Sequence, residues 1–225
     1  MNEYLREYEF DDPERGTAKV CQSPGPEFGH GSTVWDAALV LCAFLESSQG
    51  QEMVKGSRVV ELGAGTGIVS IVADKLGASW TLATDLPEYI PFIRQNIGLN
   101  IDCGCKAAPL DWKSATRLEE SENVIPGDVD WVLCADCVYL TDTVDDLVAT
   151  ILAINPRRGI IVSNETREHE NNSDAERNFI KAMYANGLTG RAVHRDVLKP
   201  QWRCDDIHVV VFERPHQSDG RVRDL

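Results

Sequence analysis

The sequence has no long apolar segment and no excess of positive charge, and each absence excludes a class of protein. Its apolar runs, such as those at residues 160–162 and 209–212, are far too short to cross a lipid bilayer. Lysine and arginine number 22 against 36 acidic residues, which gives a net charge of −14, and the basic residues are scattered. A protein that binds a nucleic-acid backbone needs a basic face. We therefore expect no membrane and no nucleic-acid partner, and a surface that attracts cationic partners.

The beginning of the sequence lacks an apolar stretch, and its cysteines do not form a disulfide pattern. Residues 1–7 are acidic rather than signal-like, and the cysteine count of seven is odd. Cys134 and Cys137 have C-x-x-C spacing, but no second pair or paired histidines complete a tetrahedral metal site. We expect buried free thiols in a reducing compartment and no metal. The sequence predicts a cytoplasmic monomer and leaves the nucleus open.

Strand and helix patterns alternate from residue 58 onward. Strands are predicted at 58–62, 80–84, 106–110, 130–135 and 159–163, and helices at 33–45, 68–76, 87–100, 143–154 and 173–187. Two later strands, at 192–194 and 207–212, have no helix between them and predict an antiparallel edge hairpin. The pattern predicts an α/β fold, a Rossmann-like doubly wound sheet of seven mostly parallel strands with helices on both faces.

The remaining segments lack this periodicity. Residues 1–31 are expected to form a loose N-terminal arm, residues 32–214 the α/β domain, and residues 215–225 a polar C-terminal tail. Residues 113–127 are predicted to form a polar loop. Capping boxes are predicted at the starts of two helices, from Thr33 with Asp36 and from Ser173 with Glu176.

A glycine-rich turn follows the first strand of the predicted sheet. Residues 61–67 read Glu-Leu-Gly-Ala-Gly-Thr-Gly and join that strand to a helix. Such a turn lets a ligand approach backbone amides closely. The spacing G-x-G-x-G is one residue shorter than the dinucleotide fingerprint, and by itself it is compatible with several nucleotide ligands.

Carboxylates stand at the ends of four predicted strands. They are Glu61, Asp85, Asp111 and Asp136, with no lysine or arginine immediately among them. Ligands of such sheets bind beyond the carboxyl ends of the strands, and an acidic rim there repels a pyrophosphate. S-adenosylmethionine has no phosphate, carries a sulfonium and an ammonium, and has a ribose diol whose hydroxyls Asp85 is placed to accept. The rim therefore predicts S-adenosylmethionine rather than NAD as the cofactor.

The motifs also resemble a known family, the class I, seven-stranded methyltransferases, and within it the protein-lysine methyltransferases. The glycine turn and Asp85 are typical of the superfamily, whereas the Trp-Asp-Ala-Ala stretch at 35–38 and the D-x-x-Y stretch at 136–139 are typical of the lysine branch. Further matching segments are residues 84–86, 110–112 and 205–208, and the resemblance runs from about Gly31 to Arg214. It is strongest to the group that methylates valosin-containing protein, Hsp70 and fungal elongation factors.

The resemblance implies a role for each matching residue. Asp136 and Tyr139 would face the acceptor, the lysine side chain of a cytosolic protein of the ATPase, chaperone or elongation-factor class. Gly63, Ala64 and Gly65 would pass under the methionine part of the cofactor, Asp85 would hold its ribose and Trp112 would flank its adenine. Trp35, Glu61, Leu86 and Ala135 complete the implied cofactor site. Asp136 would bind and orient the acceptor ammonium more than act as a base, because an ordinary carboxylate is a poor match to an amine.

Other interpretations remain open from the sequence. Trp35 opens an apolar helical stripe and could equally pack in the core; Trp112 and Tyr139 could be structural aromatics, and His208 is given no role. The chain could instead be a nicotinamide-type small-molecule N-methyltransferase or a catalytically silent cofactor-binding partner. Nucleic-acid methylation is disfavoured, because an N-P-P-Y type motif is replaced at residues 136–139.

Overall fold

A seven-stranded sheet forms the centre of the molecule. The computed structural model describes residues 4–23, 29–113, 125, 127–167 and 170–214, and the side chains of residues 170–172 are not described. The strand order is β5-β4-β3-β6-β7-β9-β8. The strands are β3 (Arg58–Leu62), β4 (Trp80–Asp85), β5 (Lys106–Pro109), β6 (Trp131–Ala135), β7 (Gly159–Glu165), β8 (Thr189–Ala192) and β9 (Ile207–Glu213). The first five are parallel, and β9 runs antiparallel to both β7 and β8, so the predicted fold class is confirmed.

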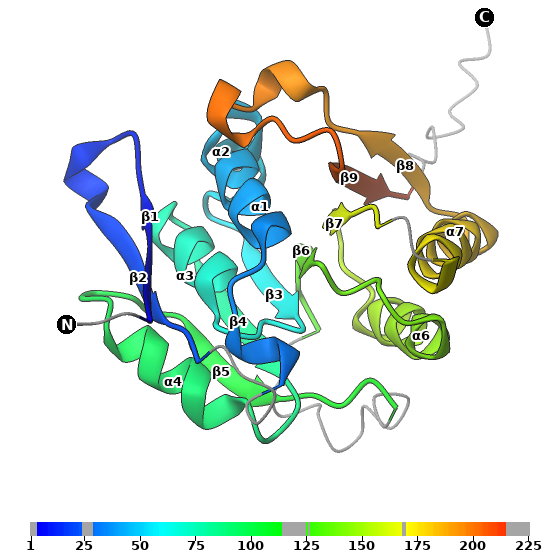
Figure 1. Ribbon diagram of the computed structural model, residues 1–225, viewed down its shortest axis with the longest axis horizontal. Coiled ribbons are helices and arrows are strands. Elements are labelled where there is room, and N and C mark those ends of the chain that lie inside the picture. Colours follow the sequence, from blue (N-terminus) through cyan, green and yellow to red (C-terminus); the bar gives the residue numbers. More distant parts are fainter. Residues whose placement is uncertain (1–3, 24–28, 114–124, 126, 168–169, 215–225) are drawn as a thin grey trace, which may run out of the picture.

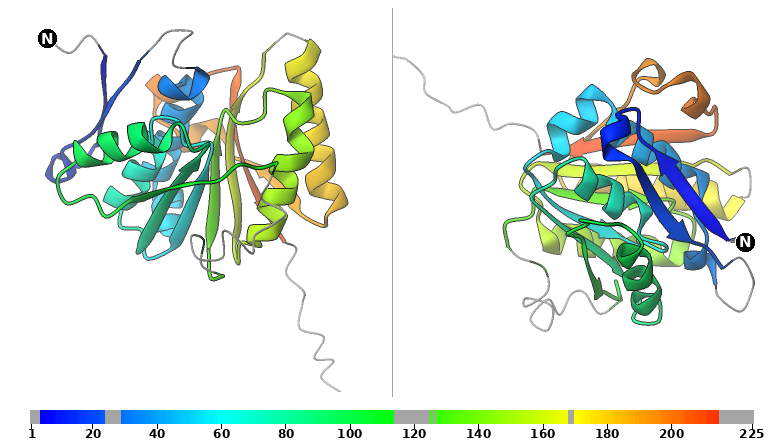
Figure 2. Two further views of the ribbon diagram at one scale, coloured as in Figure 1. Left: turned by 90° about the horizontal axis from the view of Figure 1, so that it is seen from below. Right: turned by 90° about the vertical axis from the view of Figure 1, so that its left-hand side faces the viewer.

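Helices cover both faces of this sheet (Figure 1). They are α1 (Asp36–Glu46), α2 (Ser48–Val54), α3 (Ile68–Lys75), α4 (Ile90–Gly98), α6 (Val144–Ile154) and α7 (Glu170–Ala185). Figure 2 shows α6 and α7 on one face and α1, α3 and α4 on the other. Residues 37–46 of α1 are all buried, so this helix is core on every side rather than amphipathic. Among the described residues, no helix combines the length and apolarity that crossing a membrane requires.

Three predicted helix starts were wrong, and one of them is that of α4, which begins at Ile90 rather than near residue 87. Helix α1 begins at Asp36 and has Trp35 at its N-cap, with no capping hydrogen bond from a side chain. The extended chain before it is held instead by Gln22, whose Oε1 accepts a hydrogen bond from the Val34 amide at 2.9 Å. Helix α7 begins at Glu170 rather than after Ser173. Helix α2 was not predicted.

The N-terminal segment is not a loose arm where the structure describes it. Strands β1 (Leu5–Glu9) and β2 (Thr17–Cys21) form a separate antiparallel hairpin. Asn96, in α4, and Asn100, just after α4, pair with the backbone of β2 through their side-chain amides, as a neighbouring strand would through its backbone. The Asn96 Oδ1 accepts from the Cys21 amide at 2.8 Å, and the Asn100 Oδ1 accepts from the Lys19 amide at 2.9 Å. The same two side chains donate back to the carbonyls of these residues at 3.2 and 2.8 Å.

A buried carboxylate fixes the other side of the hairpin. Glu46, at the end of α1, accepts a 2.7 Å hydrogen bond from the Tyr8 hydroxyl and one of 2.5 Å from the Asp11 amide. Lys199 pairs with Glu46 at 3.3 Å and also with Asp11. The predicted loop at 113–127 lies mostly outside the described residues, and the predicted tail at 215–225 lies wholly outside them.

Candidate active site

A cleft of about 570 Å³ opens at the carboxyl ends of β3, β4 and β6. This is where ligands bind in doubly wound sheets, and the volume is ordinary for a cofactor site. The structure brings every predicted site residue to the cleft: Trp35, Glu61, Gly63, Ala64, Gly65, Asp85, Leu86, Trp112, Ala135, Asp136 and Tyr139. Their placement in one cleft agrees with the sequence analysis, while their individual roles toward a ligand stay predictions.

The glycine turn forms the floor of the cleft. Gly63 and Gly65 have φ angles of +63° and +55°, a region that favours glycine. A Cβ on Gly63 would lie 2.8 Å from the Cys137 Sγ and 3.3 Å from the Trp112 ring, and one on Gly65 would lie 2.8 Å from the Gly31 carbonyl oxygen. The turn is therefore packed from behind, and its backbone is left for close approach by a ligand.

Asp85 shapes this turn as well as facing the cleft. Its Oδ2 accepts a 2.7 Å hydrogen bond from the Gly65 amide, and its Oδ1 accepts one of 2.7 Å from the Leu86 amide. Burial raises the pKa of Asp85, and these two hydrogen bonds oppose the rise. A carboxylate has about four lone-pair positions, so two are left for the ribose hydroxyls that the sequence analysis assigned to it.

Glu61 differs from the other acidic residues of the cleft. It is 2% exposed, and its Oε2 accepts hydrogen bonds from both the amide and the hydroxyl of Ser70, at 2.9 and 2.5 Å. Burial raises the pKa of Glu61 to about 8, against the opposing effect of Ser70, with Asp85 adding a smaller upward contribution. Much of this carboxyl is therefore protonated at neutral pH, and the acidic rim carries less charge than the sequence suggests.

Aromatic side chains line the mouth of the cleft. Trp35 is 39% exposed, and its Nε1 donates to the His30 carbonyl at 3.1 Å, so packing in the core is not its role. The His30 ring lies 6.2 Å from that of Trp35 and 6.1 Å from that of Tyr139. Burial raises the pKa of Tyr139, which keeps its phenol protonated at neutral pH. Trp112 lies on Gly63, beside the floor.

Asp136 sits where β6 leaves the sheet, in an unusual backbone conformation. Its φ is +55°, and its amide donates to the Ser163 carbonyl of β7 at 2.8 Å. This geometry buries the carboxylate, which is 3% exposed, at the end of the cleft. Its Oδ2 contacts the Arg167 guanidinium. Burial raises the pKa of Asp136, and the hydrogen bond and charge of Arg167 oppose that rise.

Arg167 corrects one statement of the sequence analysis. No lysine or arginine was expected immediately among the strand-end carboxylates, yet the fold returns Arg167 to Asp136 from beyond β7. Its Nη2 also pairs with Glu165 Oε2 at 2.7 Å. The fifth strand was predicted to end at residue 163, whereas β7 runs to Glu165. Strand-end reasoning applied to the true end would have found Glu165.

Several other lining residues were missed. His30 and Gly31 come from a short 3-10 turn (His30–Ser32) that packs over the glycine floor, and Tyr89 lies at the start of α4. Gly29 and Gly31 both approach the Tyr89 ring so closely that a Cβ on either would collide with it. These contacts depend on the chain folding back from the N-terminal hairpin, and no local pattern predicts them.

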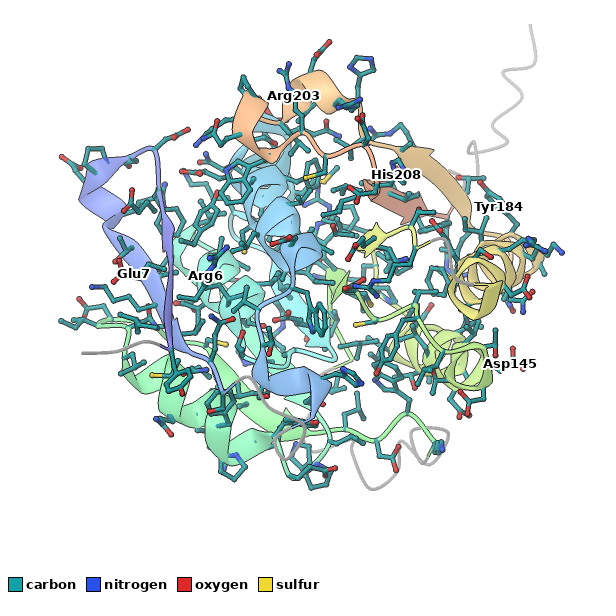
Figure 3. The ribbon with its side chains drawn as sticks, in the orientation of Figure 1. Arg6, Glu7, Asp145, Tyr184, Arg203 and His208 are labelled. Carbon is teal, nitrogen blue, oxygen red and sulfur yellow. The ribbon has the colours of Figure 1, made fainter. Side chains whose placement is uncertain are left out.

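The C-x-x-C pair and His208 are given no role in this chemistry, although Cys137 itself lines the cleft beside Gly63. Cys134 and Cys137 are free, and hydrogen bonding with Cys134 together with burial raises the pKa of the Cys137 thiol well above its ordinary value. In the part of the chain that the structure describes, no three metal-binding side chains gather. His208, labelled in Figure 3, is exposed on β9 opposite Asn164 of β7.

The fold and the cleft together define a class I methyltransferase that uses S-adenosylmethionine. The glycine floor, the lone pairs of Asp85 and the Trp112 ring fit the methionine, ribose and adenine parts of that cofactor. Magnesium protoporphyrin IX methyltransferase from Synechocystis PCC 6803, solved with bound SAM, has the same fold. The match covers 84% of this chain and 88% of the chain of that enzyme, with a TM-score of 0.55 and 17% sequence identity.

Sequence relatives give the family. A profile described as lysine methyltransferase matches residues 20–186. EEF1A lysine methyltransferase 3 of Mus musculus is 38% identical over 201 residues, which are 88% of this chain and 78% of that protein. Protein N-lysine methyltransferase METTL21A of Mus musculus is 33% identical over 193 residues, 86% of this chain and 82% of that protein. The chain belongs to the lysine methyltransferase family and is an S-adenosylmethionine-dependent protein-lysine methyltransferase.

Proposed function

We propose that this enzyme methylates a lysine of a cytosolic protein of the ATPase, chaperone or elongation-factor class, and that Asp136 and Tyr139 receive that lysine. The observation that carries the proposal is the position of Asp136. It is a buried carboxylate at the end of the cleft, next to Ala135 and already in contact with a cation. A group in that place meets an incoming ammonium close to the bound cofactor.

On the cofactor side, the chain's residues bind and orient. Gly63 and Gly65 give a floor without side chains, Asp85 accepts the ribose hydroxyls, and the Trp112 ring stacks beside the adenine. Trp35, Glu61, Ala64, Leu86 and Ala135 complete the walls. When bound, S-adenosylmethionine supplies an electrophilic methyl group on a sulfonium.

On the acceptor side, the lysine must lose a proton before its nitrogen attacks, because its ordinary pKa is about 10.4. Asp136 binds the ammonium and aligns it, and proton loss is favoured beside a second positive charge. Tyr139 adds a hydroxyl oxygen that accepts a hydrogen bond from the ammonium, or a ring face for the cationic head. Alignment of this kind is worth roughly 7–11 kcal/mol in favourable cases, so most of the rate comes from positioning.

The class of acceptor is supported by charge and by relatives. With a net charge of −14, the chain attracts a basic protein surface and repels nucleic acid. One relative is named for its action on EEF1A, and others are protein-lysine methyltransferases without a target in their names. We propose that the enzyme acts as a monomer in the cytoplasm, with the nucleus as a second location.

Labelling of an extract tests this proposal. The pure protein is incubated with methyl-labelled cofactor and cytosol from cells that lack it, and labelled bands are identified by mass spectrometry. We expect label in an elongation factor, a chaperone or an ATPase, and none when Asp136→Asn replaces the wild type. Label confined to acid-soluble small molecules would instead favour the nicotinamide-type activity.

A further inference from the structure

Three groups from three elements surround the Arg167 guanidinium. Its Nη2 contacts Asp136 Oδ2, which follows β6, and lies 2.7 Å from Glu165 Oε2 at the end of β7. Its Cζ lies 5.4 Å from the centre of the Trp35 ring, at the start of α1. Two carboxylates and an aromatic face are the groups that hold an organic cation in a protein. They form a cation cage, which is defined here as Asp136, Glu165 and Trp35.

Arg167 contacts both carboxylates of the cation cage through one nitrogen atom. A structural arginine usually presents its planar fork to one carboxylate through two nitrogens. Here a single nitrogen, Nη2, serves both carboxylates. One nitrogen between two carboxylates and beside an indole ring is also the arrangement that a lysine Nζ would make. The cage is thus matched to a point-like cation rather than to a guanidinium.

The cage also lies where an acceptor must arrive. Asp136 and Trp35 line the cleft, whereas Glu165 and Arg167 do not, so the guanidinium lies just outside the cleft, against two of its lining residues. The Arg167 side chain is 24% exposed and has solvent on one side. Its departure would leave two adjacent carboxylates without a cation, and one ammonium would restore the balance of charge.

We propose that Arg167 occupies the subsite of the acceptor ammonium in the free enzyme, and that the acceptor lysine displaces it. This inference rests on the proposed function and adds Glu165 and the Trp35 ring to the acceptor site. Trp35 then separates the two ligands, with one part of its ring toward the cofactor and one toward the lysine. Arg167 limits access to cations that bind the cage better than it does.

A lysine analogue tests the subsite without catalysis. The enzyme, saturated with S-adenosylhomocysteine, is titrated with Nα-acetyl-lysine methylamide, and binding is followed by NMR. Arg167→Met removes the competing cation and keeps the apolar stem, so the probe should bind roughly fivefold tighter or more. Arg167→Lys keeps a cation and should give little gain. Adding Glu165→Gln to Arg167→Met should weaken the probe again, by roughly fivefold.

Matched controls separate displacement from a general charge effect. Arg157→Met breaks the 2.7 Å pair with Asp130 at the opposite end of β6 and should leave probe binding unchanged. The uncharged analogue Nα-acetyl-norleucine methylamide should not distinguish Arg167→Met from wild type. Thermal melts establish that each variant is folded.

The contrary results distinguish a failure of this inference from a failure of the proposed function. If folded Arg167→Met binds the probe no better than wild type, Arg167 positions Asp136 and the inference is wrong. An equal gain in Arg157→Met would also overturn it. If Arg167→Met gains affinity but the wild type forms no methyl-lysine in an extract, the cation subsite stands and the proposed function fails. If methyl-lysine forms without that gain, only the inference fails.

Discussion

Three carboxyl groups of this cleft differ in their contacts and in how far burial raises their pKa. Glu61, Asp85 and Asp136 all follow or end strands, and the sequence treats them alike. Asp85 holds two backbone amides and Asp136 contacts a guanidinium, whereas Glu61 has only the Ser70 donors against full burial. Burial therefore raises the pKa of Glu61 to about 8. No sequence pattern reports this, because the effect depends on what surrounds the carboxyl after folding.

The raised pKa of Glu61 predicts a pH-dependent stability. Between its ordinary pKa and about 8, the folded state binds a proton that the unfolded state has lost, so stability falls as pH rises through that window. Glu61→Gln removes this dependence. Relative to wild type, the variant should gain roughly 2–4 kcal/mol of unfolding free energy between about pH 5 and about pH 8.5. Urea unfolding at both pH values measures it, and parallel curves would contradict the prediction.

Asp136 should separate acceptor binding from cofactor binding. Asp136→Asn keeps the shape and removes the charge, and asparagine tolerates the φ of +55° that alanine adopts at a cost. Turnover should fall by roughly 100-fold or more while cofactor affinity changes by less than about 1 kcal/mol. Initial rates and calorimetry on the same preparation measure both. Lost cofactor binding with residual turnover would make this carboxylate structural.

Gly63 should be sensitive for a steric reason, and the chain offers a matched control. Gly56 has a φ of +72° with open space around its missing Cβ, whereas a Cβ on Gly63 would meet Cys137 and Trp112. Gly56→Ala should cost about 1 kcal/mol of stability through backbone strain alone. Gly63→Ala should add a loss of cofactor affinity of roughly tenfold or more, because it moves Trp112. Equal cofactor affinities in the two variants would show that Trp112 does not touch the cofactor.

At the scale of elements, local patterns predict the sheet and long-range contacts decide the rest. Strand β6 is a continuous apolar run, and the glycine turn at residues 63–67 marks the step from β3 to α3, so the order of these elements follows from the sequence. The hairpin was missed because β2 is paired by the side chains of Asn96 and Asn100, which no strand pattern reveals. The alternation of buried Ala18 and Val20 was the available signal.

The side-chain amides of Asn96 and Asn100, which bond to the backbone of β2, should therefore stabilise the hairpin. Asn96→Ala leaves the Cys21 amide and carbonyl without these partners, and each buried orphan group costs about 1–3 kcal/mol. Hydrogen exchange at residues 17–21 should accelerate, while the sheet core stays protected. As a control, Asn186→Ala removes an exposed hydrogen bond from a side-chain amide to the Ala182 carbonyl. It should change hydrogen exchange neither at residues 17–21 nor in the sheet core. Unchanged exchange in Asn96→Ala would contradict the prediction and show that the remaining contacts, those of Asn100 and Glu46 among them, suffice to hold the hairpin.

The sequence likewise predicted some residues of the cleft and missed others. The glycine turn and the strand-end carboxylates were found because topology brings strand ends together, whereas Trp35, Trp112 and Tyr139 came from the family resemblance. Glu165 and Arg167 were not found, because the predicted strand ended two residues early and the arginine returns from the following segment. His30 was missed because it follows the N-terminal hairpin and does not stand at the end of a predicted strand.

At the scale of the whole molecule, the parts combine into one directed reaction. The sheet brings the proposed cofactor residues of β3 and β4 and the proposed acceptor residues after β6 to the same strand ends, where the two ligands meet in the proposed reaction. The net charge of −14 favours a basic protein surface as the proposed partner.

Amino-acid analysis of labelled protein tests the central claim most directly. Acid-precipitable protein from cytosol treated with the enzyme and methyl-labelled cofactor is hydrolysed and separated against methylated standards. Label should co-elute with methylated lysine for the wild type and be absent for Asp136→Asn. Label in methylated arginine or histidine, or label that survives the Asp136→Asn change, would contradict the account.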